Sequence, residues 1–143
     1  MNGLYFDSAY VGKCYVNEAD GPAVRASAAS GGVTSSALCI AEVACAFHRK
    51  MREGFLTAKG AREIRQFFLE DIEKEVWILV PVSERILRQV ERLTATLPKT
   101  IPLRAGDAIH IASALDAGFD EIWTNDRHLL AAAGHFGLKG RSV

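Results

Sequence analysis

Short apolar runs alternate with longer amphipathic segments along this chain. The apolar runs predict strands at residues 4–6, 33–34, 76–82, 121–123 and 136–138. Apolar positions spaced three or four residues apart predict helices at residues 8–16, 23–30, 36–53, 57–73, 83–93, 104–117 and 128–133. Such alternation is typical of an α/β fold, with a short parallel sheet of four to five strands and helices on both faces.

Several segments carry definite packing expectations. The continuously apolar run at 76–82 predicts a strand that is covered on both faces. One stripe of the predicted helix 36–53 is expected to face the core. That stripe consists of Leu38, Ala41, Ala44, Cys45 and His48. Phe67 and Phe68 present rings in two directions on helix 57–73, which favours a symmetric dimer that buries part of this surface.

The composition fits one globular domain over residues 1–143. The chain has no formal net charge, with 49% hydrophobic and 24% charged residues. We expect a cytoplasmic protein, because no apolar run approaches the ~20 residues of a membrane-spanning helix and no basic segment precedes the first apolar run. A neutral chain does not bind nucleic acid through overall charge, so such a partner requires a local basic patch.

The three cysteines indicate a reducing compartment. Cys14, Cys39 and Cys45 are odd in number, form no CxxC pair and have apolar neighbours. We therefore expect three reduced core thiols. The four histidines are not grouped with the cysteines, which argues against a zinc site.

Four acidic residues are expected to meet at one edge of the sheet. Asp7 follows the first strand, and Asp126 lies just past the strand at 121–123. Glu42 interrupts the apolar helix after the second strand, and Asp107 lies in the first turns of a later helix. Ligand sites of parallel sheets lie beyond the carboxyl ends of the strands. Gathered carboxylates repel one another unless a cation lies between them, and such hard oxygen ligands favour Mg²⁺ or Mn²⁺.

Each acidic residue also has a structural interpretation. Ser8 is the expected N-cap of the following helix, but Asp7 can cap it instead, and a buried Glu42 can be neutralised by a salt bridge. Asp107 can complement the helix dipole and pair with Arg104, while Asp126 can be a plain turn or cap residue. The occurrence of all four at the same expected edge favours a site.

Five segments in a fixed order resemble the PIN-domain ribonucleases, and most closely the VapC toxins of bacterial toxin–antitoxin pairs. They are LYFDSAYV at 4–11, SALCIAEVA at 36–44, LRAGDAIHIASA at 103–114, WTNDRHL at 123–129 and HFGL at 135–138. The segment at 103–114 is the most specific, and the order and spacing of all five carry the resemblance over essentially the whole chain.

The resemblance implies a Mg²⁺- or Mn²⁺-dependent endoribonuclease, the toxin of a type II toxin–antitoxin pair. By match, the metal-binding and catalytic residues would be Asp7, Glu42, Asp107 and Asp126, and the supporting polar residues would be Ser8, Thr124 and Asn125. The resemblance also implies an RNA substrate, a homodimer and a cognate antitoxin that blocks the site. We expect His110 to pack at the site edge without binding the metal.

Basic residues are the candidates for an RNA groove. They are Arg49, Lys50, Arg52, Arg85, Arg88, Arg92, Lys99 and Arg104. Most are expected to lie on solvated faces. Arg104 is the exception, because it lies one helical turn before Asp107 and can bind substrate there.

Two other functions are consistent with this pattern. One is a PIN fold that serves as a binding or scaffold module without catalysis. The other is a phosphate-accepting receiver-like domain. The latter fits less well because Asp7 has no acidic neighbour and no lysine follows the strand that ends near Thr124. A dehalogenase-type phosphatase would need an Asp-x-Asp, but Ala9 occupies the second position.

Overall fold

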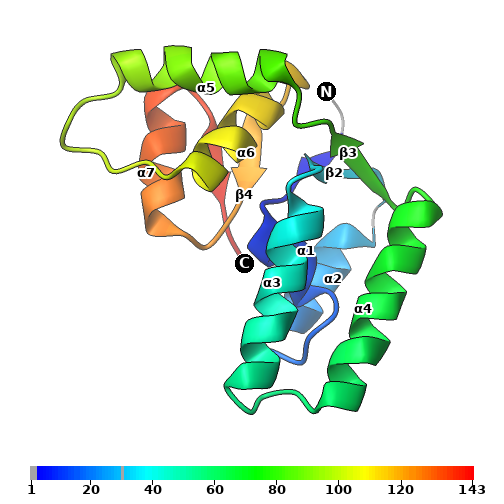
Figure 1. The fold of residues 1–143 in the computed structure, drawn as a ribbon. Coiled ribbons are helices and arrows are strands. Elements are labelled where there is room, and N and C mark those ends of the chain that lie inside the picture. The colour runs from blue at the N-terminus through cyan, green and yellow to red at the C-terminus, as the bar shows by residue number, and fades with distance from the viewer. Residues whose placement is uncertain (1–2, 30) are drawn as a thin grey trace.

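The computed structural model describes residues 3–29 and 31–143 (Figure 1). The strands are β1 (Leu4–Tyr5), β2 (Val33–Ser36), β3 (Trp77–Val80), β4 (Glu121–Trp123) and β5 (Lys139–Arg141). The helices are α1 (Ser8–Lys13), α2 (Gly21–Ala28), α3 (Cys39–Arg52), α4 (Ala58–Glu73), α5 (Glu84–Thr96), α6 (Ala105–Asp116) and α7 (Arg127–His135). The predicted α/β class and its alternation of elements are confirmed.

All paired strands are parallel. β1, β2 and β3 form one sheet in that order, and β4 pairs with β5. A bridge between Phe6 and Trp123 joins the two parts, and the Asp7 amide donates to the Trp123 carbonyl at 3.1 Å. The strand order is therefore β5-β4-β1-β2-β3, with the carboxyl ends of all five strands at one edge.

Helices cover both faces of this sheet. Phe6 packs with core residues of α1, α2, α3 and α4, whereas Tyr5 packs with residues of α6 and α7. The two residues separate in this way because successive side chains of a strand point to opposite faces. Figure 1 shows α3 and α4 side by side, with α5, α6 and α7 grouped on the other side of the sheet. None of the helices formed by the described residues is long and apolar enough to span a membrane.

The first helix is capped by a different residue than predicted. Asp7, and not Ser8, is the N-cap of α1, and its Oδ1 accepts a hydrogen bond from the Tyr10 amide at 2.9 Å. The helix also ends at Lys13, short of the predicted residue 16. Ser8 is therefore the first helical residue, and its hydroxyl is available for another partner.

The α3 helix buries a different stripe from the predicted one. Ser35 belongs to β2 and donates to the Phe6 carbonyl, so the helix begins only at Cys39. Its buried residues are Cys39, Val43 and Phe47, spaced four apart. The expected stripe is wrong, because the larger side chains occupy the core. None of its five members is buried: Leu38 is half-buried, and the exposed members are Ala41, Ala44, Cys45 and His48.

β3 is an edge strand and is not covered on both faces. It pairs only with β2, and Ile78 is 53% exposed. The prediction of a doubly covered strand was therefore wrong, because a continuous apolar run also suits a strand at the edge of a sheet. In the following helix Ser83 is the N-cap, and its hydroxyl accepts a hydrogen bond from the Ile86 amide.

Element ends differ from the prediction near glycines. The predicted helix 23–30 begins earlier, at Gly21, and Ser30 lies outside the described residues. α7 continues through Gly134 to His135. The last strand lies at Lys139–Arg141 and not at 136–138, because Gly137, with φ of +81°, turns the chain before the strand can begin.

The three cysteines are free thiols, as predicted, but they do not share one environment. Cys39 is buried, Cys14 is half-buried and Cys45 is exposed. The expectation of three core thiols is therefore wrong for Cys45, which lies on the solvent side of α3.

Candidate active site

Asp7 lies at the carboxyl end of β1 and is 5% exposed. Burial raises the pKa of its carboxyl, and the nearby Asp126 raises it further. Hydrogen bonds from Thr124 and from the Tyr10 amide offset part of this rise. Asp7 thus has the alternative structural role as a helix cap and also contributes a carboxylate to the predicted edge of the sheet.

Glu42 lies in the first turn of α3 and is held by two hydrogen bonds. Its Oε1 accepts from the Ser8 hydroxyl at 2.7 Å and lies 2.9 Å from Nε2 of His110. The bond to His110, followed by that to Ser8, lowers the pKa of Glu42. No lysine or arginine among the described residues forms an ion pair with Glu42, so the alternative salt bridge is absent there and the histidine takes its place.

Asp107 and Asp126 complete the set of four carboxylates. Asp107 lies in the first turn of α6, and burial raises its pKa, as do Asp126, Glu42 and Asp7 through charge repulsion. Asp126 is the N-cap of α7, where its Oδ1 accepts from the amides of His128 and Leu129. The structure shows no ion pair between Arg104 and Asp107 in the described parts of the chain.

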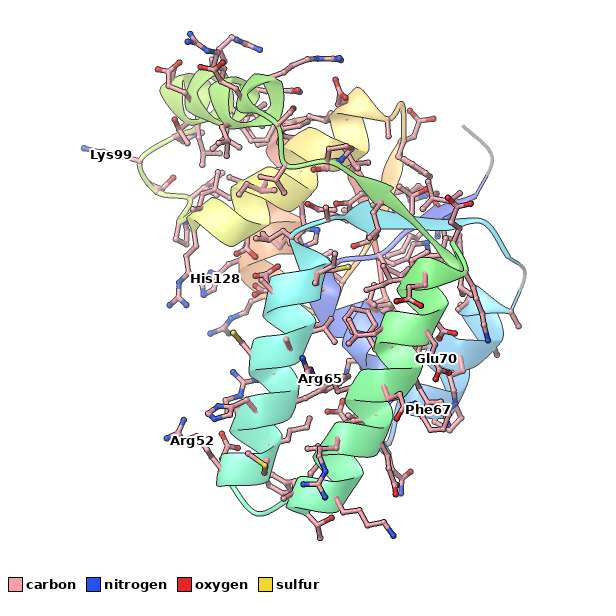
Figure 2. The ribbon with its side chains drawn as sticks, turned by 45° about the vertical axis from the view of Figure 1, so that its right-hand side comes forward. Arg52, Arg65, Phe67, Glu70, Lys99 and His128 are labelled. Atoms are coloured by element: carbon pink, nitrogen blue, oxygen red, sulfur yellow. The ribbon has the colours of Figure 1, made fainter. Side chains whose placement is uncertain are left out.

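A single cleft of about 920 Å³ connects these groups. Its lining includes all four carboxylates together with Ser8 and Arg104. Arg49, Lys50 and Arg52 of α3 line the same cleft, and Figure 2 shows Arg52 near the end of α3, on the side away from α4. The cleft therefore has an acidic part at the sheet edge and a basic part along α3.

Two of the predicted supporting residues lie outside the cleft lining. Thr124 is fully buried and accepts a hydrogen bond from the Asp126 amide at 3.0 Å. Asn125 accepts from the Tyr10 hydroxyl and donates to Asp20. Thr124 therefore supports the loop that carries Asp126, whereas Asn125 ties this loop to α1 and to the turn before α2.

The carboxylates suit a hard divalent cation by their chemistry. They supply oxygen ligands only, and within residues 3–29 and 31–143 no lysine or arginine forms an ion pair with Asp7, Asp107 or Asp126. As placed, no three acidic, histidine or cysteine side chains of the described chain are close enough to hold an ion. Hydrogen bonds engage Oδ1 of Asp7, Oε1 of Glu42 and Oδ1 of Asp126, so cation binding requires the carboxylates to move closer together but does not require them to give up these partners.

Two more residues shape the site, and sequence reasoning missed one of them, Gly106. His110 packs at the site as expected, where its ring is 2% exposed and lies between Glu42 and Tyr5. Gly106 leaves room for Glu42, since a Cβ at this position would lie 2.9 Å from Glu42 Oε2. The three-residue spacing from Asp107 to His110 was the sequence signal for the place of His110 in the site, because it puts both side chains on one helix face.

The comparisons identify the family. Residues 16–135 match the family model of the PIN domain, and this span covers most of the chain, so the protein belongs to the PIN-domain family. Its fold is similar to that of VapC20 from Mycobacterium tuberculosis, a toxin that cleaves the sarcin–ricin loop. The two structures superpose with a TM-score of 0.67 at 15% identity, over 90% of this chain and 94% of the other. No curated protein matches the sequence.

The family match confirms the resemblance noted in the sequence and excludes the receiver-like alternative. The matched span includes Glu42, Asp107 and Asp126, while Asp7 precedes it. Asp7 is placed in the site by the geometry, since β1 brings it into the same cleft.

Proposed function

We propose that this protein is a Mg²⁺- or Mn²⁺-dependent endoribonuclease and the toxin of a type II toxin–antitoxin pair. The observation that carries the proposal is the cleft, in which carboxylates from four separate segments lie next to a basic helix face. Membership in the PIN-domain family supports it, as does the fold shared with a toxin that cleaves an RNA loop.

The four carboxylates would hold the cation in this function. A bound divalent ion activates water and offsets the charge that develops on the phosphodiester. The raised pKa values of Asp7 and Asp107 mean that their charged forms are disfavoured when no cation is bound. A cation near these two carboxylates removes that penalty.

The basic side chains of the cleft would orient the RNA backbone. Arg104 precedes Asp107 by one turn and contacts the phosphate nearest the carboxylates. Arg49 and Arg52 lie about 10 and 15 Å beyond Glu42 along α3, at about 1.5 Å per residue, so they meet phosphates of flanking nucleotides. Lys50 is paired with Glu18 at 2.7 Å and Arg49 with Glu53 at 3.8 Å, so both contribute less free charge. Such a local patch is what a neutral chain requires.

RNA cleavage in the presence and absence of EDTA tests the proposal. The substrates are total RNA and a panel of stem-loops that includes a sarcin–ricin loop, since the similar toxin cleaves that loop. We expect cleavage only with Mg²⁺ or Mn²⁺, and loss of cleavage in Asp7→Asn and Asp107→Asn. Glu91→Gln, a change at an exposed carboxylate on α5, is the matched control.

The outcomes separate the proposal from its alternative. Full activity in EDTA, or in both aspartate variants, refutes the metal mechanism. RNA that binds in the cleft without being cleaved under any divalent ion supports the non-catalytic PIN module.

We also propose a homodimer and an antitoxin that covers the cleft. Phe68 is buried in the core, whereas Phe67 is 61% exposed and projects from α4 (Figure 2). The two rings thus face in two directions, as the sequence predicts, and the exposed ring is available for a subunit contact. Light scattering of the isolated protein at micromolar concentration tests this, and a monomer contradicts it.

A further inference from the structure

A buried chain of polar groups leads from the sheet to the cleft. The Tyr5 hydroxyl lies 2.9 Å from Nδ1 of His110, and Nε2 of the same ring lies 2.9 Å from Glu42 Oε1. The Ser8 hydroxyl lies 2.7 Å from the same Glu42 oxygen and 2.9 Å from Nε2. Tyr5 is fully buried and His110 and Ser8 nearly so. Three segments distant in sequence are thus joined at one carboxylate.

The partners determine which ring nitrogen carries the hydrogen. Glu42 is a carboxylate at neutral pH and only accepts hydrogen bonds, so Nε2 donates to it. Burial keeps the Tyr5 hydroxyl protonated, and this hydroxyl donates to Nδ1. Ser8 donates its own hydrogen to Glu42. Every group in the chain therefore has a partner with the correct polarity.

The second oxygen of Glu42 is limited by shape. A Cβ on residue 106 would lie 2.9 Å from Oε2, which is too close for the carboxylate to stay in place, so glycine leaves the space that Oε2 needs beside α6. Two donors fix one carboxylate oxygen, and the backbone of α6 limits the other. Glu42 consequently has one defined orientation on the cleft wall.

Stability alone does not require this arrangement. The Glu42 side chain is 40% exposed, so water could satisfy its carboxylate. His110, by contrast, is 2% exposed and directs Nε2 at this carboxylate. Hydrogen bonds from outside the set of ligands fix the orientation of metal ligands and commonly change metal affinity about 10–100-fold.

We infer that His110 is a positioning residue that, with Tyr5 behind it and Ser8 beside it, holds Glu42 ready to bind the divalent cation. This inference rests on the proposed function and adds the group that orients one of the four carboxylates. His110 does not bind the cation itself, because Tyr5 and Glu42 occupy both of its ring nitrogens.

Binding of Mn²⁺ to the protein without RNA tests the inference. The Mn²⁺ concentration that gives half of the full thermal stabilisation is measured for the wild type and three variants. We expect His110→Leu to raise it about 10–100-fold and Tyr5→Phe to raise it less. His110→Gln, which keeps a donor at about the reach of Nε2, should recover most of the affinity. The control is Ile109→Ala, a core change in the adjacent position of α6 with no polar link to Glu42.

A second measurement does not depend on the cation or on folding of the leucine variant. The ¹⁵N chemical shifts of the His110 ring in the metal-free wild type should report hydrogen on Nε2 and none on Nδ1. Hydrogen on Nδ1 alone overturns the inference. The inference is also overturned if His110→Leu and Tyr5→Phe both have the same Mn²⁺ midpoint as the wild type, and in that case the proposed function still stands. Wild-type protein that binds no Mn²⁺ and cleaves no RNA overturns both.

Discussion

A methyl group at residue 106 should separate activity from stability. Gly106 is helical, so Gly106→Ala is compatible with its backbone. The new Cβ would lie 2.9 Å from Glu42 Oε2, closer than the two atoms can remain. The atom in its way is the end of a flexible side chain. We therefore expect Glu42 to move, with loss of its bonds to His110 and Ser8.

The effects on stability should partly cancel. Alanine in place of glycine inside a helix gains about 0.5–1 kcal/mol. Losing the two hydrogen bonds to His110 and Ser8 costs about 1–3 kcal/mol net, and water replaces part of the loss because Glu42 is 40% exposed. The net change is a loss of about 2 kcal/mol or less, which corresponds to a fall in Tm of at most about 10 °C for a domain of this size.

Activity should fall far more than stability. A displacement of about 1 Å at a reacting site can cost about 100-fold in rate, and Oε2 of Glu42 must move by about 0.5 Å to reach an ordinary 3.4 Å contact with the new Cβ. RNA cleavage rates and Mn²⁺ midpoints are measured beside thermal melts. Gly134→Ala on α7 is the control, since a Cβ there meets nothing within 4 Å. A folded Gly106→Ala protein with wild-type cleavage and a wild-type Mn²⁺ midpoint would refute the role assigned to the position of Glu42.

Four further predictions concern charge, access and assembly. The raised pKa of Asp107 means that its negative charge destabilises the metal-free fold once the pH exceeds the pKa of this group in the unfolded chain. Asp107→Asn should therefore have a higher Tm than the wild type at neutral pH and the same Tm in strong acid. Mg²⁺ should not raise the Tm of this variant. The lowered pKa of Glu42 means that its negative charge stabilises the fold at neutral pH, so Glu42→Gln should have a lower Tm than the wild type there. The difference in Tm should vanish as the pH falls through the pKa of Glu42 in the folded protein. A bulky maleimide should react first at exposed Cys45 and block RNA cleavage, and Cys45→Ser protein should be resistant, as mass spectrometry and activity will show. Phe67→Ser should shift the proposed dimer toward monomer in light scattering without lowering the Tm, because this ring is 61% exposed.

The sequence predicted the features that depend on local pattern. Asp7 directly follows a short apolar run, and Asp126 follows another, so parallel pairing alone brings them to one edge. The order of helices and strands followed from apolar spacing in the same way. These predictions needed only the side-chain repeats of helices and strands and the rule that the carboxyl ends of parallel strands lie at the same edge of a sheet.

Features that depend on competition between faces could not be predicted in this way. Helix α3 has apolar residues on more than one side, and the buried stripe is the one with Val43 and Phe47 because large side chains fill the core. The expected stripe, which includes Cys45, instead borders the cleft and solvent. Similarly, an apolar run does not reveal whether β3 is central or at the edge, since this depends on which strands follow it in space.

The start of α6 shows how much of the site one segment provides. Arg104, Asp107 and His110 are spaced by three and line the cleft together, while residues 108–114 are all buried. The start of this helix thus carries along one face the groups proposed to bind phosphate, to bind the metal and to position Glu42, and the rest of its surface is held in the core. A one-residue insertion after Asp107 would rotate His110 by about 100° relative to it. Such a rotation would also move the buried side chains of the helix out of their places in the core. The packing of the helix therefore fixes the positions of these three residues relative to one another.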